Sequence, residues 1–353
     1  MIIYLQPKTP FSKAIPRSDT LFGAICWAIR LLYGKEKLEE LLEKFKFDDV
    51  PYNAPFVLSS MFPYAENKEK KFLFLPCPLF PPTSEKDFNS VEEYKKNKAN
   101  KKVKYVSQTV FNAIASGSYK KDDCVVQAGI RMTKDEQKEL EDLEKLFEES
   151  EAVHNTLNRI TYQSKIYYES MVAKTKQKSH LKTGFYFLIK LDEKDKKLVS
   201  MLKDAIDFLK EKGIGGNTSI GFGQCCIQIE DEAKDKPIIA NNPNEKCLVT
   251  LSLMLPSKLD QEHLKKEQIQ TKSFAQLERR KGFLESSFLS DIKRIWKPTL
   301  FMLAEGSVFL RDEDRPNQIY GSIYKYEDSN FHDLEIRING LAYTVGIKER
   351  ETL

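Results

Sequence analysis

The chain has 353 residues, of which 41% are hydrophobic and 31% are charged, as is typical of a soluble globular protein with room for two domains. Its apolar runs fall well short of the roughly 20 residues of a membrane span, and the N-terminus MIIYLQPKTP lacks the regions of a signal peptide, so we expect a cytoplasmic protein with no membrane partner. Because the net charge is only +4, a nucleic acid would have to be held by local patches.

The chain begins with a short apolar strand, Ile2 to Leu5, followed by a loop and a helix. Ser18 is suited to the N-cap of that helix, with Asp19 in its first turn, and Gly34 ends it. A stripe at helical spacing must face a core, and it consists of Leu21, Phe22, Ile25, Ile29 and Leu32.

The loop before this helix is basic. Lys8, Lys13 and Arg17 surround Phe11 at a helix N-terminus, where anions are favoured. The alternative is a solvated loop with incidental charge.

A second helix is predicted through Leu38, Leu41, Leu42 and Phe45. Two strand-like runs follow, FVLSSMFPY and FLFLPCPLFPP, separated by the polar turn Ala65 to Lys71. They indicate a hairpin or two neighbouring strands.

The region from about 83 to 158 has the composition of an insertion. Tyr94 to Tyr105 holds six lysines and no acid, whereas Asp135 to Glu151 holds nine acids and two lysines. Helical spacing of Leu140, Leu143 and Phe147 predicts a solvated surface helix in the acidic block. The lysine block is either an RNA-facing patch or solubilising charge.

Aromatic and basic residues gather after the insertion. The run Ile160 to Met171 is strand-like, and it brings Arg159 together with Tyr162, Tyr167 and Tyr168. Guanidinium and aromatic groups stack on unpaired bases and hold phosphates, although ordinary sheet packing explains the tyrosines equally well. A strand from Gly184 to Leu191 follows.

A helix over 198–212 leads into the turn GIGGNTSIGFG, which holds five of the fifteen glycines in eleven positions, and a strand, Phe222 to Ile229, leads out. Bare N–H groups in such a turn suit an anionic backbone, while the plain alternative is a tight helix-to-strand connection. Neither a P-loop nor a dinucleotide-binding pattern is present. The six cysteines form no C-x-x-C pair, so we expect free thiols, no metal and no cofactor.

Without the insertion, the order of elements is β-α-β-β-α-β, which is the ferredoxin-like or RRM-like order. We therefore predict an α+β fold with two tandem ferredoxin-like modules: residues 1–230 with the insertion, a linker at 231–246, and residues 247–353. In the second module, strands begin at Cys247, Asn339-Gly340 signals a hairpin turn, and one run holds Arg279, Arg280 and Lys281.

Six landmarks now occur in the order and spacing found in the RAMP proteins of CRISPR effector complexes. They are PRSDTLFGAICWAI, the pair FVLSSMFPY and FLFLPCPLFPP, HNTLNRIT, GIGGNTSIGFGQ, ERRKGF and AEGSVF. The chain resembles the Cas-five group of these proteins, and within it subunit four of the type III-A Csm complex, from about Ile3 to Ile347.

This resemblance implies a non-catalytic ribonucleoprotein subunit of antiviral defence. Such proteins hold the 5′ tag of the crRNA, cap the filament of backbone RAMP subunits and bind the large Cas-ten subunit. A thumb-like element would lie in the insertion. Relatives usually carry a basic residue in the middle of the glycine turn, where this chain has Asn217 and Thr218, so N–H or hydroxyl contacts would have to replace a charge contact.

From the residues and the resemblance together, the candidate RNA-binding residues are Lys13, Arg17, Ser18, Asp19, Arg159, Thr161, Tyr162, Gly215, Gly216, Asn217, Thr218, Ser219, Gly221, Gly223, Arg279, Arg280 and Lys281.

The alternative is a metal-independent endoribonuclease that processes crRNA precursor, because related RAMP proteins do so. That chemistry needs a general base, most often histidine. The chain has four histidines, His154, His180, His263 and His332, and His154 is the candidate because it is close in sequence to Arg159.

Overall fold

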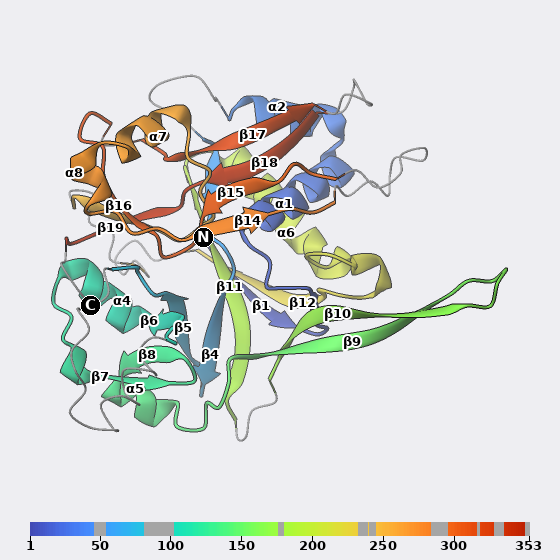
Figure 1. The fold of residues 1–353 in the computed structure, drawn as a ribbon, viewed down its shortest axis with the longest axis horizontal. Helices are drawn as coiled ribbons and strands as arrows, with labels where there is room; N and C mark the ends of the chain where they lie inside the picture. Colours follow the sequence, from blue (N-terminus) through green and yellow to red (C-terminus); the bar gives the residue numbers. More distant parts are fainter. Residues whose placement is uncertain are drawn as a thin grey trace.

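The computed structural model describes residues 1–45, 54–80, 102–175, 180–231, 239, 245–283, 296–315, 318–327 and 335–349. Most of the lysine block and most of the predicted linker lie outside these ranges. Figure 1 shows a layered α+β body from which one long hairpin projects.

The first part of the chain follows the predicted order of strands and helices. Its elements are β1 (Ile2–Pro7), β2 (Phe11–Ser12), α1 (Ser18–Tyr33), α2 (Lys35–Glu43), β3 (Phe56–Leu58), β4 (Phe62–Asn67) and β5 (Lys70–Pro76). β4 and β5 pair as an antiparallel hairpin, one of the two predicted arrangements, but the predicted turn from Ala65 to Lys71 was too long because the strands pair as far as Asn67 and Lys70. The predicted helix stripe is buried at Leu21, Phe22, Ile25 and Ile29. Leu32 was expected to be buried too, but it lies in the last turn of α1 and is 44% exposed.

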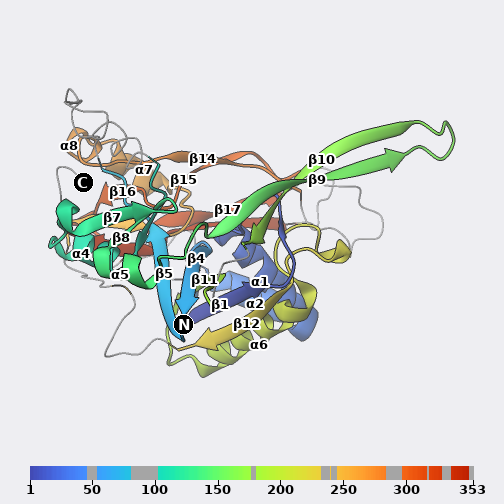
Figure 2. The same ribbon diagram turned by 90° about the horizontal axis from the view of Figure 1, so that it is seen from below.

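The large sheet is organised around β1. It contains β11 (Lys182–Leu191) and β12 (Cys225–Glu230), and β1 lies between these two strands, antiparallel to both. β11 pairs in turn with β4 and β3. α6 (Lys196–Lys212) packs beside α1 against this sheet (Figure 2), and both helices contribute to its main apolar core. The pairing of two ferredoxin-like modules in tandem stays a prediction.

The middle region extends the same sheet in the order β5-β6-β8-β7. Its elements are β6 (Tyr105–Ser107), α4 (Gln108–Ser116), η1 (Lys121–Asp123), β7 (Cys124–Gln127), β8 (Ile130–Thr133) and α5 (Lys134–Glu139). The prediction of a longer acidic surface helix was wrong, because α5 ends at Glu139. Leu140 and Leu143 instead follow it in turns and are buried under the sheet with Phe72 and Phe74.

The projecting hairpin consists of β9 (Phe147–Leu157) and β10 (Ser164–Lys174), paired over their whole length. The prediction of a strand starting at Ile160 was wrong for its first four residues, which form the turn. There the Asn158 side chain accepts hydrogen bonds from the N–H groups of Ile160 and Thr161. The insertion boundary predicted near residue 158 therefore falls inside one hairpin.

The C-terminal part is built from short strands. Its elements are β13 (Cys247–Thr250), α7 (Lys258–Leu264), α8 (Glu267–Gln270), β14 (Leu277–Arg280), β15 (Leu300–Leu303), β16 (Val308–Leu310), β17 (Gly321–Glu327), β18 (Glu335–Leu341) and β19 (Thr344–Ile347). They form three small sheets, β16-β13-β19, β14-β15 and β17-β18.

The hairpin turn predicted at Asn339-Gly340 was wrong, because both residues lie inside β18 and pair with β17. A Cβ on Gly340 would lie 2.3 Å from the Cβ of Leu255. Glycine is therefore needed here for close packing rather than for a turn. All six cysteines are free, as expected.

Candidate RNA interface

The glycine turn combines strained and ordinary backbone. Gly213, Gly215, Gly221 and Gly223 have positive φ, whereas Gly216 does not. A Cβ on Gly223 would lie 2.0 Å from the carbonyl oxygen of Ile214. The Gly223 N–H also donates to the carbonyl oxygen of Pro10, at 2.8 Å. Gly223 thus fixes the turn against the first loop of the chain, as the connector interpretation requires.

The middle of the turn leaves its backbone open. Among the residues described, the N–H groups of residues 215–219 have no hydrogen-bond acceptor. Gly216, Asn217 and Ser219 are exposed, and η2 (Thr218–Ile220) forms a single 3-10 turn. Successive free N–H groups in a turn form a concavity that favours anions, so the turn has the features of a ligand surface as well as those of a connector.

Asn217 joins this turn to the hairpin. Its backbone is left-handed, with a φ of 58°. Its side-chain amide donates to the Ser12 hydroxyl at 3.3 Å and to a carboxylate oxygen of Glu169 on β10. The Ser12 hydroxyl donates to the same Glu169 oxygen at 3.0 Å. Asn217, predicted to contact RNA, therefore positions the turn through its side chain and leaves its own N–H free.

One face of the hairpin, the polar face, points toward the glycine turn. It carries Glu169, and two residues away the cross-strand partners His154 and Tyr167, which stack with ring centroids 5.1 Å apart. Lys165 follows on the same face and is exposed. Lys13 lies beside the end of the hairpin that joins the body, where its N–H donates to the Ser170 carbonyl oxygen on β10 at 2.6 Å.

The tip of the hairpin holds three of the predicted residues, Arg159, Thr161 and Tyr162. Tyr162 is 79% exposed and has a φ of 54°. Ile160, which the sequence reasoning did not include among the site residues, is 89% exposed. Arg159, Lys165 and Lys13 form no ion pair within the described part of the chain, so their charges are available to an anionic ligand.

The other face of the hairpin, the apolar face, was missed by the sequence analysis. Its four large side chains are between 55% and 65% exposed, and they are Val153, Leu157, Ile166 and Tyr168. Apolar residues alternate with polar ones in the sequence of each strand. They form one surface only because the strand register pairs Val153 with Tyr168. Glu149 and Glu151 lie on the same face nearer the body, and these carboxylates disfavour a phosphate backbone there.

The start of α1 does not form the predicted anion site. Arg17, not Ser18, is the N-cap residue. Ser18 is fully buried, and its hydroxyl accepts a hydrogen bond from the N–H of Leu253 at 3.1 Å. Its own N–H donates to the Ser60 hydroxyl at 3.0 Å. Contact of the Ser18 side chain with RNA is therefore excluded, because that side chain joins the N-terminal and C-terminal parts of the chain.

Charged neighbours of Ser18 also join the N-terminal and C-terminal parts of the chain. Arg280 on β14 binds Asp19 in a bidentate pair, with N–O distances of 3.0 and 2.9 Å. The Arg17 guanidinium lies 3.3 Å from the Glu278 carboxylate, also on β14. Burial lowers the pKa of the nearby Lys297, the Arg280 charge lowers it further, and Asp19 opposes both effects. We call this group of residues the α1–β14 junction.

Arg279 and Lys281 point away from the junction. Both are exposed, and the Lys281 ammonium lies 4.7 Å from the centre of the Trp296 ring. Arg280, which lies between them in the sequence, is on the opposite side of β14, where it binds Asp19.

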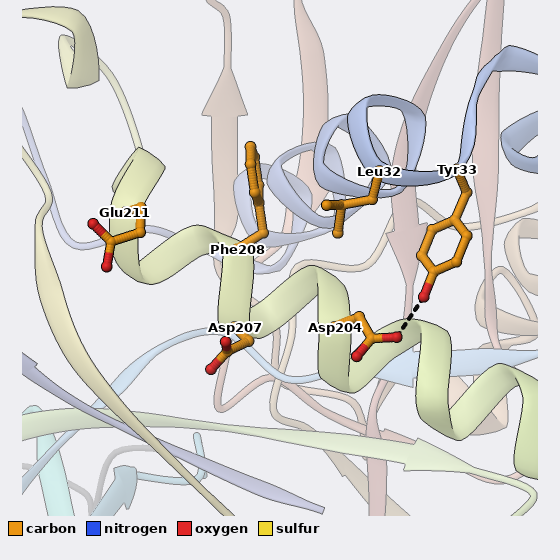
Figure 3. A pocket seen from close by; sticks show the side chains of 6 residues that line it. All are labelled: Leu32, Tyr33, Asp204, Asp207, Phe208 and Glu211. Carbon is orange, nitrogen blue, oxygen red and sulfur yellow. Dashed lines mark hydrogen bonds between the residues drawn. The ribbon is translucent and has the colours of Figure 1, made fainter.

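A pocket of about 550 Å³ lies between the end of α1 and α6 (Figure 3). It is lined by Leu32, Tyr33, Asp204, Asp207, Phe208 and Glu211. The Tyr33 hydroxyl donates to Asp204, and this bond is the main reason that the pKa of Tyr33 is raised. Three carboxylates and no basic side chain line the pocket, so it is unsuited to RNA.

The ranges that the structure describes offer no site of another kind. No three His, Cys, Asp or Glu side chains there are grouped as metal ligands, and no helix there has the length and apolar character needed to cross a membrane.

Known proteins match the chain along its whole length. The family model of the RAMP superfamily matches residues 3–226, and that of the CRISPR Csm4 C-terminal domain matches residues 243–347. The CRISPR system Cms protein Csm4 of Thermococcus onnurineus (strain NA1) is 26% identical over 356 residues, covering 99% of this chain and 98% of that protein.

Two solved structures share the fold. A chain of the Csm3–Csm4 subcomplex of a type III-A CRISPR-Cas interference complex matches with a TM-score of 0.62 and 19% identity, over 98% of this chain and 99% of that one. A chain of the Csm1–Csm4 cassette in complex with cA4 matches with a TM-score of 0.57 and 21% identity, over 99% and 98%. Since the RAMP superfamily model spans more than half of the sequence, this chain belongs to the RAMP superfamily, and its C-terminal part matches the Csm4 C-terminal domain.

Proposed function

We propose that this protein is a non-catalytic subunit of a type III-A Csm effector complex that holds the 5′ tag of the crRNA. The observation that carries the proposal is the row of open N–H groups at residues 215–219, fixed beside the polar face of a projecting hairpin. Backbone N–H groups and unpaired cations hold phosphates, while exposed tyrosines stack on unpaired bases. We also propose the tandem ferredoxin-like arrangement for the two parts of the chain.

The two faces of the hairpin suit different partners. The polar face and the glycine turn carry the groups that suit RNA. The apolar face, with Tyr168 65% exposed, suits a protein surface, because contiguous exposed apolar side chains usually mark an interface. The matched structures contain Csm4 with Csm3 or with Csm1. We infer that this chain likewise bridges the large Cas-ten subunit to a backbone subunit, with the apolar face turned toward protein.

RNA binding by the purified chain tests the proposal directly. Fluorescence anisotropy would compare a labelled single-stranded RNA that carries the repeat-derived tag with an RNA of equal length and scrambled sequence, and with the duplex form of each. We expect the tag RNA to bind most tightly and duplex RNA least, because stacking on tyrosines needs unpaired bases. Equally weak binding of all of them would contradict the proposal.

The second candidate function is the metal-independent endoribonuclease. The observation in its favour is that the His154 imidazole lies 3.7 Å from the Glu169 carboxylate, an arrangement that can orient a general base. His154 lies on β9, about 10 Å of strand before its end at Leu157, and Arg159 lies in the turn beyond that end, so the two would not act on one phosphate. Incubation with precursor RNA in EDTA separates the functions: we expect no specific cleavage, whereas cleavage lost in His154→Ala and kept in His180→Ala would establish the enzyme.

A further inference from the structure

The outer face of the β14–β15 pair is an exposed surface of basic and aromatic side chains. Arg279 and Phe301 are cross-strand partners and therefore share a face, and Leu277 and Lys281 lie two residues to either side of Arg279. Phe301 is 59% exposed, Leu277 65% and Trp296, which lies against Lys281, 54%. We call these five residues the β14–β15 platform.

The face of β14 opposite the platform is bonded to the start of α1. On the opposite face of β14, Arg280 is bound to Asp19 and Glu278 lies against Arg17. The β15 residue on that opposite face, Met302, is fully buried. The basic side chains that remain outside are thus separated by the strand from the acids that could neutralise them.

β14 is linked to the glycine turn through its face opposite the platform. A Cβ on Gly215 would lie 3.6 Å from the Cγ of Pro16, and the next residue, Arg17, contacts Glu278 on β14. The glycine turn and β14 therefore flank the same short segment, and Figure 2 shows β14, β15 and the hairpin along one edge of the molecule.

We propose that the β14–β15 platform stacks an unpaired base of the RNA whose backbone lies on the glycine turn, with Phe301 beneath the base and Arg279 and Lys281 at the neighbouring phosphates. This inference rests on the proposed function and adds the residues that meet a base. Single-stranded RNA is the partner chosen because aromatic rings flanked by cations are the usual platform for single strands.

Trp296 provides a local probe, because the chain has only one other tryptophan, Trp27 on α1. In a Trp27→Phe background, titration with a short oligouridylate should quench Trp296 fluorescence at the concentrations where anisotropy reports binding. Phe301→Ala in the same background should weaken binding about tenfold, or about 1.4 kcal/mol, within the range for one stacked base. Tyr33→Ala, which removes an aromatic group 43% exposed beside the acidic pocket, should leave binding unchanged.

The possible outcomes separate the two proposals. If anisotropy reports binding but Trp296 is not quenched and Phe301→Ala binds normally, the platform is not an RNA site although the proposed function stands. If no RNA binds at all, both proposals fail. If Trp296 responds to purified partner subunits and not to RNA, the platform is a protein interface and the base-stacking proposal is overturned. The melting temperature of each variant would show whether the fold is retained.

Discussion

The α1–β14 junction and the glycine turn have similar sequence features and opposite structural roles. Both place polar groups and backbone N–H groups beside a basic loop. In the junction, the Ser18 side chain and N–H are bonded inside the protein and Asp19 is bonded to Arg280. In the turn, the N–H groups of residues 215–219 are without an acceptor in the described part of the chain. A sequence pattern of polar residues beside a basic loop thus indicates that these groups have a binding partner. It does not indicate whether that partner is another part of the same chain or a separate ligand.

The largest expected effect is on folding at the fixed end of the turn. Gly223→Ala would combine a φ of +71° with a Cβ 2.0 Å from the Ile214 carbonyl oxygen. We expect a loss of about 3 kcal/mol of stability or more, measured by chemical denaturation. Gly221→Ala is the control, because its φ is +93° but nothing lies within 4 Å of its Cβ, so only strain of about 1 kcal/mol is expected. Equal losses in the two variants would mean that the close contact is not what matters.

The junction should contribute to stability and not to RNA affinity. In Asp19→Ala, Arg280 loses its bidentate partner and Lys297 loses the neighbouring charge that favours its protonated form. We expect a loss of about 2 kcal/mol with tag-RNA affinity unchanged. Asp135→Ala, which breaks an exposed pair with Lys138, should cost almost nothing. If Asp19→Ala binds RNA more weakly while its stability is unaltered, Asp19 contacts RNA and the prediction is wrong.

Sequence periodicity predicted the elements whose partners are generic apolar surfaces. The stripe of α1 and the strands β1 and β11 belong to this class, because any core accepts them. Periodicity failed where the same spacing fits two structures: Leu140 and Leu143 are three residues apart in turns rather than in a helix. It also failed where a residue is chosen by a distant neighbour, as Gly340 is by Leu255.

The candidate site divides in the same way. The glycine turn could be located from composition alone. Leu253, which bonds to the Ser18 hydroxyl, and Arg280, which binds Asp19, are more than 200 residues away in the sequence, and no local pattern encodes these two contacts. The apolar face of the hairpin depends on the register between β9 and β10, which the sequence analysis did not place because it read one strand where there are two.

An intermediate effect on RNA alone is expected at the open end of the turn. Gly216 has an ordinary φ, and an added Cβ would meet the Ser12 hydroxyl at 3.5 Å, an ordinary contact. Gly216→Ala should therefore keep its melting temperature but lower tag-RNA affinity about tenfold, or about 1.4 kcal/mol, because the methyl group obstructs the approach of a phosphate. Gly23→Ala on α1, where the Cβ meets nothing within 4 Å, is the matched control. If affinity is retained in Gly216→Ala, the turn is only a connector.

The smallest expected effect concerns Lys13, whose neighbour Ser12 bonds to Asn217 in the turn, and it separates charge contacts from backbone contacts. Lys13 is exposed, its N–H is hydrogen-bonded to β10, and its side chain forms no ion pair among the residues described. If it neutralises one phosphate, Lys13→Ala should reduce the slope of log affinity against log salt by about 0.7 while the melting temperature stays the same. Lys197→Ala, an exposed lysine at the start of α6, should leave the slope unchanged. The Gly216→Ala variant should also keep the full slope, because an uncharged N–H group neutralises no phosphate and so releases no counterion from the RNA; its loss should weaken binding equally at every salt concentration. A slope unaltered in Lys13→Ala would mean that the turn holds RNA through its backbone alone.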